Sequence, residues 1–105
     1  MPEITLNGTT LSVDDDGYLV DRNAWTREIA VLLAKEEGID ELTDRHWAVI
    51  DFARADFDAK GETPGLRRIS VQAGVPTKEL YALFPKGPGK KVARIAGLTK
   101  PKGCV

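Results

Sequence analysis

Glycine and proline interrupt this chain at short intervals, and that punctuation limits what it can fold into. Glycine adopts the left-handed conformation that closes a helix, whereas proline fits only a first helical turn. From residue 23 onward, stretches with helical spacing of apolar residues begin or end at such positions: Gly38, Pro64-Gly65, Gly74, Pro88 and Gly97. The pattern predicts a mainly α fold, an orthogonal bundle of short helices.

Two of these stretches are long enough for helices of several turns. The first has apolar residues at i, i+4, i+7 and i+8 from Trp25, with Asn23 as its expected N-cap and Gly38 at its end. The second begins at Thr43 and continues to the sequence AKGETPG, which breaks it. His46 falls in the first turn of this second helix. We expect it to be a partly exposed surface histidine and not a general base.

The segment LRRISVQAGVPTKELYALFP predicts two short helices joined at Gly74, with the spacing of a helix-turn-helix core. DNA binding by a regulator is therefore one alternative function. However, the second helix offers only Lys78, Glu79 and Tyr81 outward, and the acidic body of the chain would repel phosphates. We expect no direct binding to nucleic acid.

The first 20 residues predict a small β-hairpin or a three-stranded ribbon. Apolar residues alternate on both sides of Asn7-Gly8, and Asp16-Gly17 follows; both dipeptides are strong turn signals. We interpret the run Asp14-Asp15-Asp16 as a charged turn, because a Ca²⁺ loop needs oxygen ligands at alternate positions. No metal site is expected there.

A chain of 105 residues fits one domain with a modest core. We expect residues 1–97 to form that domain, with the β-hairpin in 1–20 and the helices in 23–97. The last of these helices would occupy the sequence PGKKVARIAG. Residues 98–105 are expected to form a flexible C-terminal arm, since proline and glycine prevent a helix from continuing.

The net charge of −1 conceals a strong asymmetry. Residues 1–60 carry 14 acidic against 6 basic residues, whereas the last twenty carry no acidic residue and six basic ones: Lys86, Lys90, Lys91, Arg94, Lys100 and Lys102. A basic end is often just a solvated terminus, although it also steers a protein toward acidic partners. With no membrane-length apolar run and no secretory signal, we expect a cytoplasmic monomer that binds no membrane.

Cys104, the only cysteine, is the second residue from the end of this chain. Free cysteine is usually buried, so a thiol on a terminus rich in Gly, Pro and Lys indicates reactivity or attachment. A free thiol is only a few per cent thiolate at neutral pH, and its reactivity depends on nearby charges. The basic residues expected to favour the anionic sulfur are Lys90, Lys100, Lys102 and, as the best candidate for direct contact, Arg94.

No other catalytic set is visible. One cysteine and one histidine cannot form a structural zinc site within one chain, and there is no phosphate loop or pair of carboxylates for hydrolysis. We therefore expect no metal and no cofactor. A single nucleophile on a mobile tether suits a carrier that accepts a group from one protein and passes it to another. A structural subunit whose tail inserts into a larger enzyme is a further alternative.

The segment LFPKGPGKKVARIAGLTKPKGCV resembles the C-terminus of the DsrC/TusE family, the sulfur carriers similar to the gamma subunit of dissimilatory sulfite reductase. The resemblance extends over nearly the whole chain, through DDDGYL, His46-Trp47 and Arg67-Arg68 before LYALFPKGP. It implies a mostly helical fold with a small β element. It also implies a persulfide on Cys104, with sulfur-donor and sulfur-acceptor proteins as partners.

Members of this family that serve sulfite reductase have a second cysteine eleven positions before the last one, where this chain has Ala93. The resemblance therefore excludes an intramolecular disulfide and favours the single-cysteine, TusE-like branch, whose relay ends in 2-thiouridine of tRNA. A protein associated with a sulfite reductase complex and a divergent paralogue of sulfur metabolism are the alternatives. The sequence does not choose the donor or the acceptor.

Overall fold

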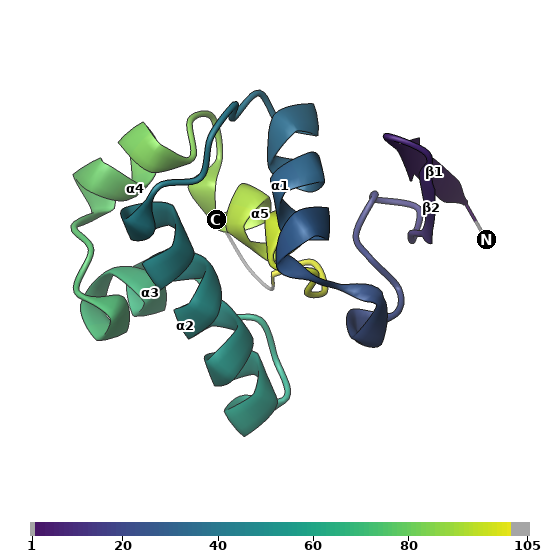
Figure 1. The fold of residues 1–105 in the computed structure, drawn as a ribbon. Helices are drawn as coiled ribbons and strands as arrows, with labels where there is room; N and C mark the ends of the chain where they lie inside the picture. The colour runs from purple at the N-terminus through teal and green to yellow at the C-terminus, as the bar shows by residue number, and fades with distance from the viewer. Residues whose placement is uncertain (1, 102–105) are drawn as a thin grey trace.

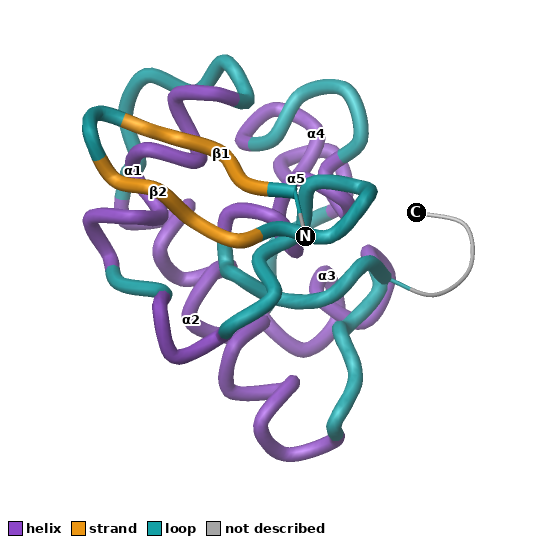
Figure 2. Tube along the Cα trace, turned by 90° about the vertical axis from the view of Figure 1, so that its right-hand side faces the viewer, coloured by secondary structure: helices purple, strands orange, loops and turns teal. Residues whose placement is uncertain are grey.

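In the computed structural model, which describes residues 2–101, a β-hairpin precedes five α-helices (Figure 1). Strands β1 (Glu3–Leu6) and β2 (Thr9–Ser12) pair antiparallel around Asn7-Gly8, two residues with positive φ. This confirms the predicted hairpin. After β2, an isolated antiparallel bridge joins Val13 to Leu19. The two views together show the hairpin lying on the outside of the helical body (Figure 2).

The first helix begins later than the sequence suggested. A short 3-10 helix, η1 (Arg22–Ala24), comes first, and Thr26 then caps α1 (Arg27–Glu36) by accepting a backbone hydrogen bond. The assignment of Asn23 as N-cap is therefore wrong, because Asn23 lies inside η1. The interruption also places Trp25 between the two elements, where its side chain is free to reach α5.

The second helix, α2 (Asp44–Lys60), has Thr43, the residue at which the helix was predicted to begin, as its N-cap. His46 is buried, with only 7% of its surface exposed, so the expected surface histidine is wrong. Its Nδ1 accepts from the Thr43 amide at 3.0 Å, and its Nε2 lies 2.8 Å from the carbonyl oxygen of Leu83. Because a carbonyl only accepts, Nε2 carries the proton. His46 thus joins the start of α2 to the end of α4 (Thr77–Leu83).

Helices α3 (Leu66–Ala73) and α4 are joined at Gly74, which has a φ of 71°. The helix-turn-helix-like pair is confirmed. Tyr81 projects from α4 with 52% of its surface exposed. Glu79, in contrast, accepts two hydrogen bonds of 2.7 Å from Arg45 on α2, so an acidic group on α4 is fixed in an ion pair.

Helix α5 (Pro88–Ile95) occupies the centre of the bundle, packed against α1, α2 and α4 (Figure 1). Its Val92 and Ile95 are buried. Each fully buried side chain of this kind stabilises the fold by about 1.5–3 kcal/mol relative to exposure. The other four helices and the residue after α4 each contribute a large, fully buried side chain to this core: Leu33, Ile50, Ile69, Leu80 and Phe84. The predicted mainly α bundle is confirmed.

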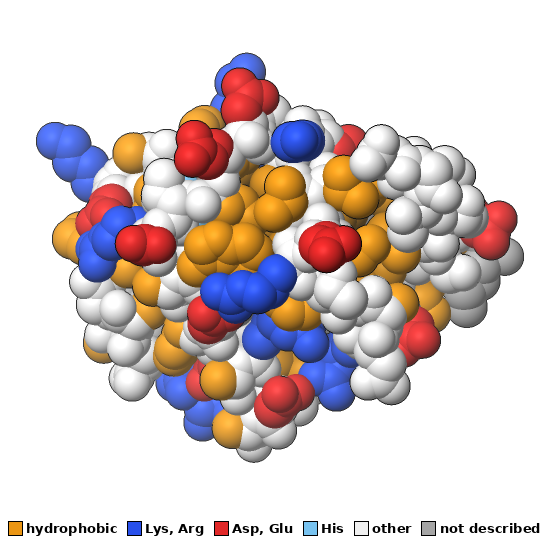
Figure 3. All heavy atoms as spheres, in the orientation of Figure 1, with side chains coloured by type: hydrophobic (Ala, Val, Ile, Leu, Met, Phe, Trp, Pro, Cys, Tyr) orange, Lys and Arg blue, Asp and Glu red, His pale blue; other side chains and the backbone are white. Residues whose placement is uncertain are grey.

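The face shown in Figure 3 carries acidic and basic side chains next to one another, with apolar atoms between them. A phosphate backbone is recognised by clustered positive charge, and this face does not provide it. Within residues 2–101, no helix has the length and apolar character needed to cross a membrane.

Candidate functional site

Of the predicted site residues, Lys90, Arg94 and Lys100 lie in the described part of the chain, whereas Lys102 and Cys104 lie outside the described residues. The local geometry is therefore that of the surface around Pro101, the last described residue. Three features define it: the packing of residues 98–101, the fastening of the end of α5, and a cavity at the start of α5.

Residues 98–101 pack on the helical body. Leu98 is fully buried in the core, and Pro101 is also buried. The Thr99 carbonyl accepts a hydrogen bond of 2.8 Å from the hydroxyl of Thr63. The expected start of the arm at residue 98 is therefore too early. Leu98 and Pro101 are apolar, and their burial stabilises the packed position over a solvent-exposed one.

Only three residues carry the chain from Pro101 to Cys104, a span of about 10–11 Å when fully extended. Next to Pro101, Lys100 Nζ lies 3.7 Å from Asp16 Oδ2. An exposed ion pair of this kind adds little stability. It does show that the end of the described chain passes the turn that precedes η1.

The C-terminal end of α5 is fastened by two side chains from distant parts of the sequence. Trp25 Nε1 donates to the Ile95 carbonyl at 2.8 Å, and Arg54 Nη1 donates to the Ala96 carbonyl at 2.7 Å. The Arg54 guanidinium also lies over the Trp25 ring, 3.9 Å from its centroid. These bonds satisfy carbonyls that a helix end leaves unpaired. They fix where the chain turns, at Gly97, toward its end.

Arg94 is held inside the body by three acceptors. Its Nε donates to the Gly17 carbonyl at 3.0 Å, its Nη1 donates to Glu37 at 2.7 Å, and its Nη2 pairs with Glu36. Burial lowers the pKa of the guanidinium, but its hydrogen bonds to Glu36 and Glu37 outweigh burial and leave the pKa raised. Arg94 therefore ties the N-terminal turn and α1 to α5. Its contact with Cys104 stays a prediction.

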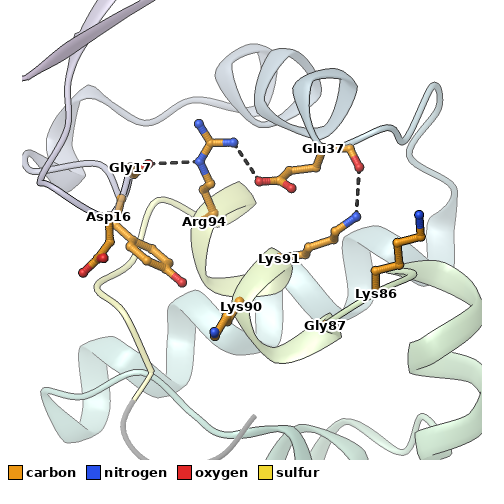
Figure 4. Close-up of a pocket in the computed structure, with 9 residues that line it drawn as sticks. Asp16, Gly17, Glu37, Lys86, Gly87, Lys90, Lys91 and Arg94 are labelled. Atoms are coloured by element: carbon orange, nitrogen blue, oxygen red, sulfur yellow. Dashed lines mark hydrogen bonds and ion pairs between the residues drawn. The ribbon is translucent and has the colours of Figure 1, made fainter.

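A cavity of about 310 Å³ opens beside Arg94, at the start of α5 (Figure 4). The turn at Asp16 and Tyr18 forms one wall, and the end of α1 forms another. Lys86 and Lys90 line it and are exposed, whereas Lys91, which also lines it, is half-buried. The structure thus brings Lys90 and Arg94 to the same cavity. Lys100 contacts Asp16 at its edge.

Sequence reasoning missed Tyr18, Trp25 and Arg54 as parts of this region. Trp25 was assigned to the apolar face of a helix, and Arg54 is one charged residue among many on α2. No local pattern marks either of them as a partner of the α5 carbonyls. Their contacts join residues 70 and 42 positions apart, which only the tertiary fold brings together.

The aspartate run near the cavity behaves as a charged turn. The Asp14 carboxylate accepts from the backbone amides of Asp16 and Tyr18 at 2.9 and 3.0 Å. Across the described range, no group of three or more His, Cys, Asp or Glu side chains could hold a metal ion. The roles of Cys104 and of the basic residues near it in sequence stay predictions.

The chain is similar to known proteins over nearly its full length. Residues 5–105 match the family model described as DsrC like protein. The gamma subunit of dissimilatory-type sulfite reductase from Nitratidesulfovibrio vulgaris is 39% identical over 105 residues, which cover 100% of both chains. Sulfurtransferase TusE from Pectobacterium atrosepticum is 38% identical over 110 aligned positions, covering 97% of this chain and 99% of the relative.

A solved structure agrees with these relatives. The crystal structure of the oxidized gamma-subunit of the dissimilatory sulfite reductase (DsrC) from Archaeoglobus fulgidus is 38% identical to this chain. The match covers 99% of this chain and 100% of that one, with a TM-score of 0.80.

Proposed function

The chain belongs to the DsrC-like family, and from that premise we propose that it is a sulfur-relay carrier which holds sulfane sulfur on Cys104 as a persulfide. The relatives bear the names of a sulfurtransferase and of a sulfite reductase subunit, and sulfur transfer suits both. The observation that carries the proposal is the placement of the chain's only thiol three residues after Pro101, the last described residue, which is buried in the body.

The proposed reaction is two thiol exchanges. The Cys104 thiolate attacks the terminal sulfur of a donor persulfide, a new S–S bond forms, and the donor thiolate leaves with the electron pair of the broken S–S bond. An acceptor thiolate then attacks the sulfane sulfur on Cys104, and the Cys104 thiolate is released. Neither step needs an oxidant or a reductant.

Both the thiolate and the persulfide of Cys104 are anions, and nearby cationic side chains stabilise an anion. Lys100 and Lys90 are exposed in the described structure, and Lys102 lies two positions before Cys104 in the sequence. In water, one such charge at 4 Å contributes about 1 kcal/mol. We assign these lysines to favouring the anionic sulfur and attracting acidic partner surfaces. Arg94 is engaged with two carboxylates, so its contribution is mainly to hold the site together.

Ala93 supports the single-thiol branch of the family. It is fully buried on α5, and its carbonyl accepts the Leu98 amide at 2.9 Å. No thiol is available there to form a disulfide or trisulfide with Cys104. Identity does not choose between branches, because the sulfite reductase and TusE relatives are 39% and 38% identical. We therefore propose a TusE-like relay toward tRNA 2-thiouridine, with service to a sulfite reductase complex as the second candidate.

Mass spectrometry tests the carrier function. The full chain is incubated with a protein persulfide donor, digested, and analysed without reductant. We expect one added sulfur on the C-terminal peptide, removable by dithiothreitol and transferable to an acceptor thiol. Cys104→Ser is the matched control, because it keeps size and changes only the nucleophile. Equal sulfur gain by Cys104→Ser would refute the proposal.

A genetic test separates the two branches. In a strain lacking this chain, loss of tRNA 2-thiouridine that the natural gene restores and Cys104→Ser does not would support the relay. Unchanged 2-thiouridine, together with copurification of the chain with sulfite reductase subunits, would support the second candidate instead.

A further inference from the structure

Among the described residues, the cavity beside Arg94 has hydrogen-bond donors without a partner, whereas its two carboxylates already have partners. The Glu37 carboxylate accepts from Arg94, and its backbone carbonyl accepts from Lys91 Nζ at 2.9 Å. The Asp16 carboxylate faces Lys100. The two acidic side chains that line the cavity are therefore each paired with a cation. The polar groups of the cavity that have no partner among the described residues determine which kind of ligand it can bind.

Tyr18 supplies the most informative unpaired group. Its side chain lines the cavity although only 5% of the residue is exposed. Its hydroxyl has no hydrogen-bond partner in the part of the chain that the structure describes. No side-chain polar atom in that part is both sealed from solvent and unpartnered, so this hydroxyl keeps some contact with solvent, and Tyr18 lines the cavity. Burial, followed by the nearby Asp16, raises the pKa of Tyr18, which keeps the hydroxyl a proton donor.

Two lysines complete the unpaired set. Lys86 and Lys90 are exposed, line the cavity, and have no ion-pair or hydrogen-bond partner between residues 2 and 101. Figure 4 shows them on either side of Gly87, at the N-terminal end of α5. The first amides of a helix have no intrahelical acceptor, and the helix dipole favours an anion there. All of these free groups select a ligand that accepts hydrogen bonds and carries negative charge.

We propose that this cavity binds the oxyanion end of a small sulfur donor, of which thiosulfate is the simplest. The inference rests on the proposed role of Cys104. Lys100 lies 3.7 Å from Asp16 at the cavity edge, and the Cα atom of Cys104 can be at most about 10–11 Å from that of Pro101. The Cys104 thiolate attacks the outer sulfur of thiosulfate and forms a new S–S bond. The bond between the two sulfurs of thiosulfate breaks, sulfite leaves with its electron pair, and Cys104 becomes a persulfide anion.

Binding is measured first without the chemistry. Thiosulfate is titrated at low salt into ¹⁵N-labelled Cys104→Ser chain, and amide shifts are followed. We expect saturable shifts at Gly17, Tyr18 and Lys90. Adding Lys90→Gln should weaken binding about tenfold, because a charge-assisted hydrogen bond is lost, and adding Tyr18→Phe should weaken it roughly threefold. Lys78→Gln on α4 is the control for total charge, since Lys78 is equally cationic and lies outside the cavity.

Transfer is measured second, with the natural chain. Thiosulfate should release one sulfite per chain and load one sulfur onto Cys104, and Lys90→Gln should slow both about tenfold. Absence of saturable shifts, or equal weakening by Lys78→Gln, would overturn the binding site. Binding of thiosulfate without sulfite release would overturn the assignment of thiosulfate as a donor. Sulfite release at the same rate from the natural chain and from Lys90→Gln would overturn it too. Loading of Cys104 from a protein persulfide is a separate reaction, so these failures are distinguishable from failure of the carrier function.

Discussion

A methyl group added to Gly97 would stand 2.6 Å from Cδ1 of Trp25, and the φ of Gly97 is 71°. Only glycine fits this turn between α5 and residue 98. We expect Gly97→Ala to lower the free energy of unfolding by about 2–4 kcal/mol, combining overpacking with a left-handed backbone that alanine resists. Urea denaturation followed by circular dichroism measures the loss.

Gly38→Ala is the matched control for this substitution. Gly38 has a φ of 86° but nothing within 4 Å of an added methyl group. It should lose only the backbone contribution, about 1–2 kcal/mol. Equal losses for the two alanine variants would show that the contact with Trp25 does not constrain the turn.

The hydrogen bond from Trp25 to the Ile95 carbonyl should be measurable on its own. Trp25→Phe keeps an aromatic ring under Arg54 but removes the indole donor, so we expect a loss of about 1–3 kcal/mol in unfolding free energy. Trp47→Phe is the control, because Trp47 also has an arginine over its ring but, in the described structure, makes no hydrogen bond through its indole. A similar loss in both variants would assign the effect to ring size.

Replacing His46 tests whether its two hydrogen bonds join α2 to α4. His46→Leu leaves the Thr43 amide and the Leu83 carbonyl unpaired in a buried place, and we expect it to cost about 2–4 kcal/mol in unfolding free energy. His46→Gln can still act in a capping box with Thr43 and should cost less. The order of the two variants is read from their urea midpoints; the reverse order would contradict the assigned bonding.

Low pH should weaken the ion pair between Asp56 on α2 and Arg68 on α3. Asp56 is nearly buried and accepts hydrogen bonds of 2.9 and 2.7 Å from Arg68, which lower its pKa despite the opposing effect of burial. A lowered folded pKa gives stability that is present above the unfolded pKa, about 3.9, and is lost as pH falls through the folded value. The stability advantage of the natural chain over Asp56→Asn should therefore shrink between pH 6 and pH 2.

Urea unfolding at several pH values measures this difference. Asp51→Asn is a suitable comparison, because Asp51 forms an exposed pair with Arg27 at 3.1 Å and should change stability little at any pH. An advantage over Asp56→Asn that stays constant down to pH 2 would contradict the assigned ion pair.

Local signals were enough for most of the fold. Four predicted features depend on the conformational preferences of single residues, and the structure has them: the turn at Asn7-Gly8, the helix start at Thr43, the break at Gly74 and the helix start at Pro88. The errors arose where a distant partner decides the outcome. His46 can be buried because the Leu83 carbonyl, 37 residues away in sequence, accepts a hydrogen bond from its Nε2.

The candidate site divides in the same way. Cys104 stands out in the sequence because it is the only thiol, and Lys90 and Lys100 because of the charge asymmetry. The partners of Arg94 could not be inferred, since Glu36 and Glu37 lie more than fifty residues earlier and are two of many acidic residues. The Tyr18 hydroxyl has no hydrogen-bond partner among residues 2–101, and this too is a property of packing with no local sequence signature.

The burial of Leu98 and Pro101 has a consequence for the order of events in the relay. The described body measures 35 × 28 × 21 Å, whereas three residues allow a separation of at most about 10–11 Å between the Cα atoms of Pro101 and Cys104. For the proposed carrier, this reach predicts that donor and acceptor proteins bind overlapping surfaces near Pro101. Each should then inhibit the other competitively, and sulfur should move by a ping-pong scheme.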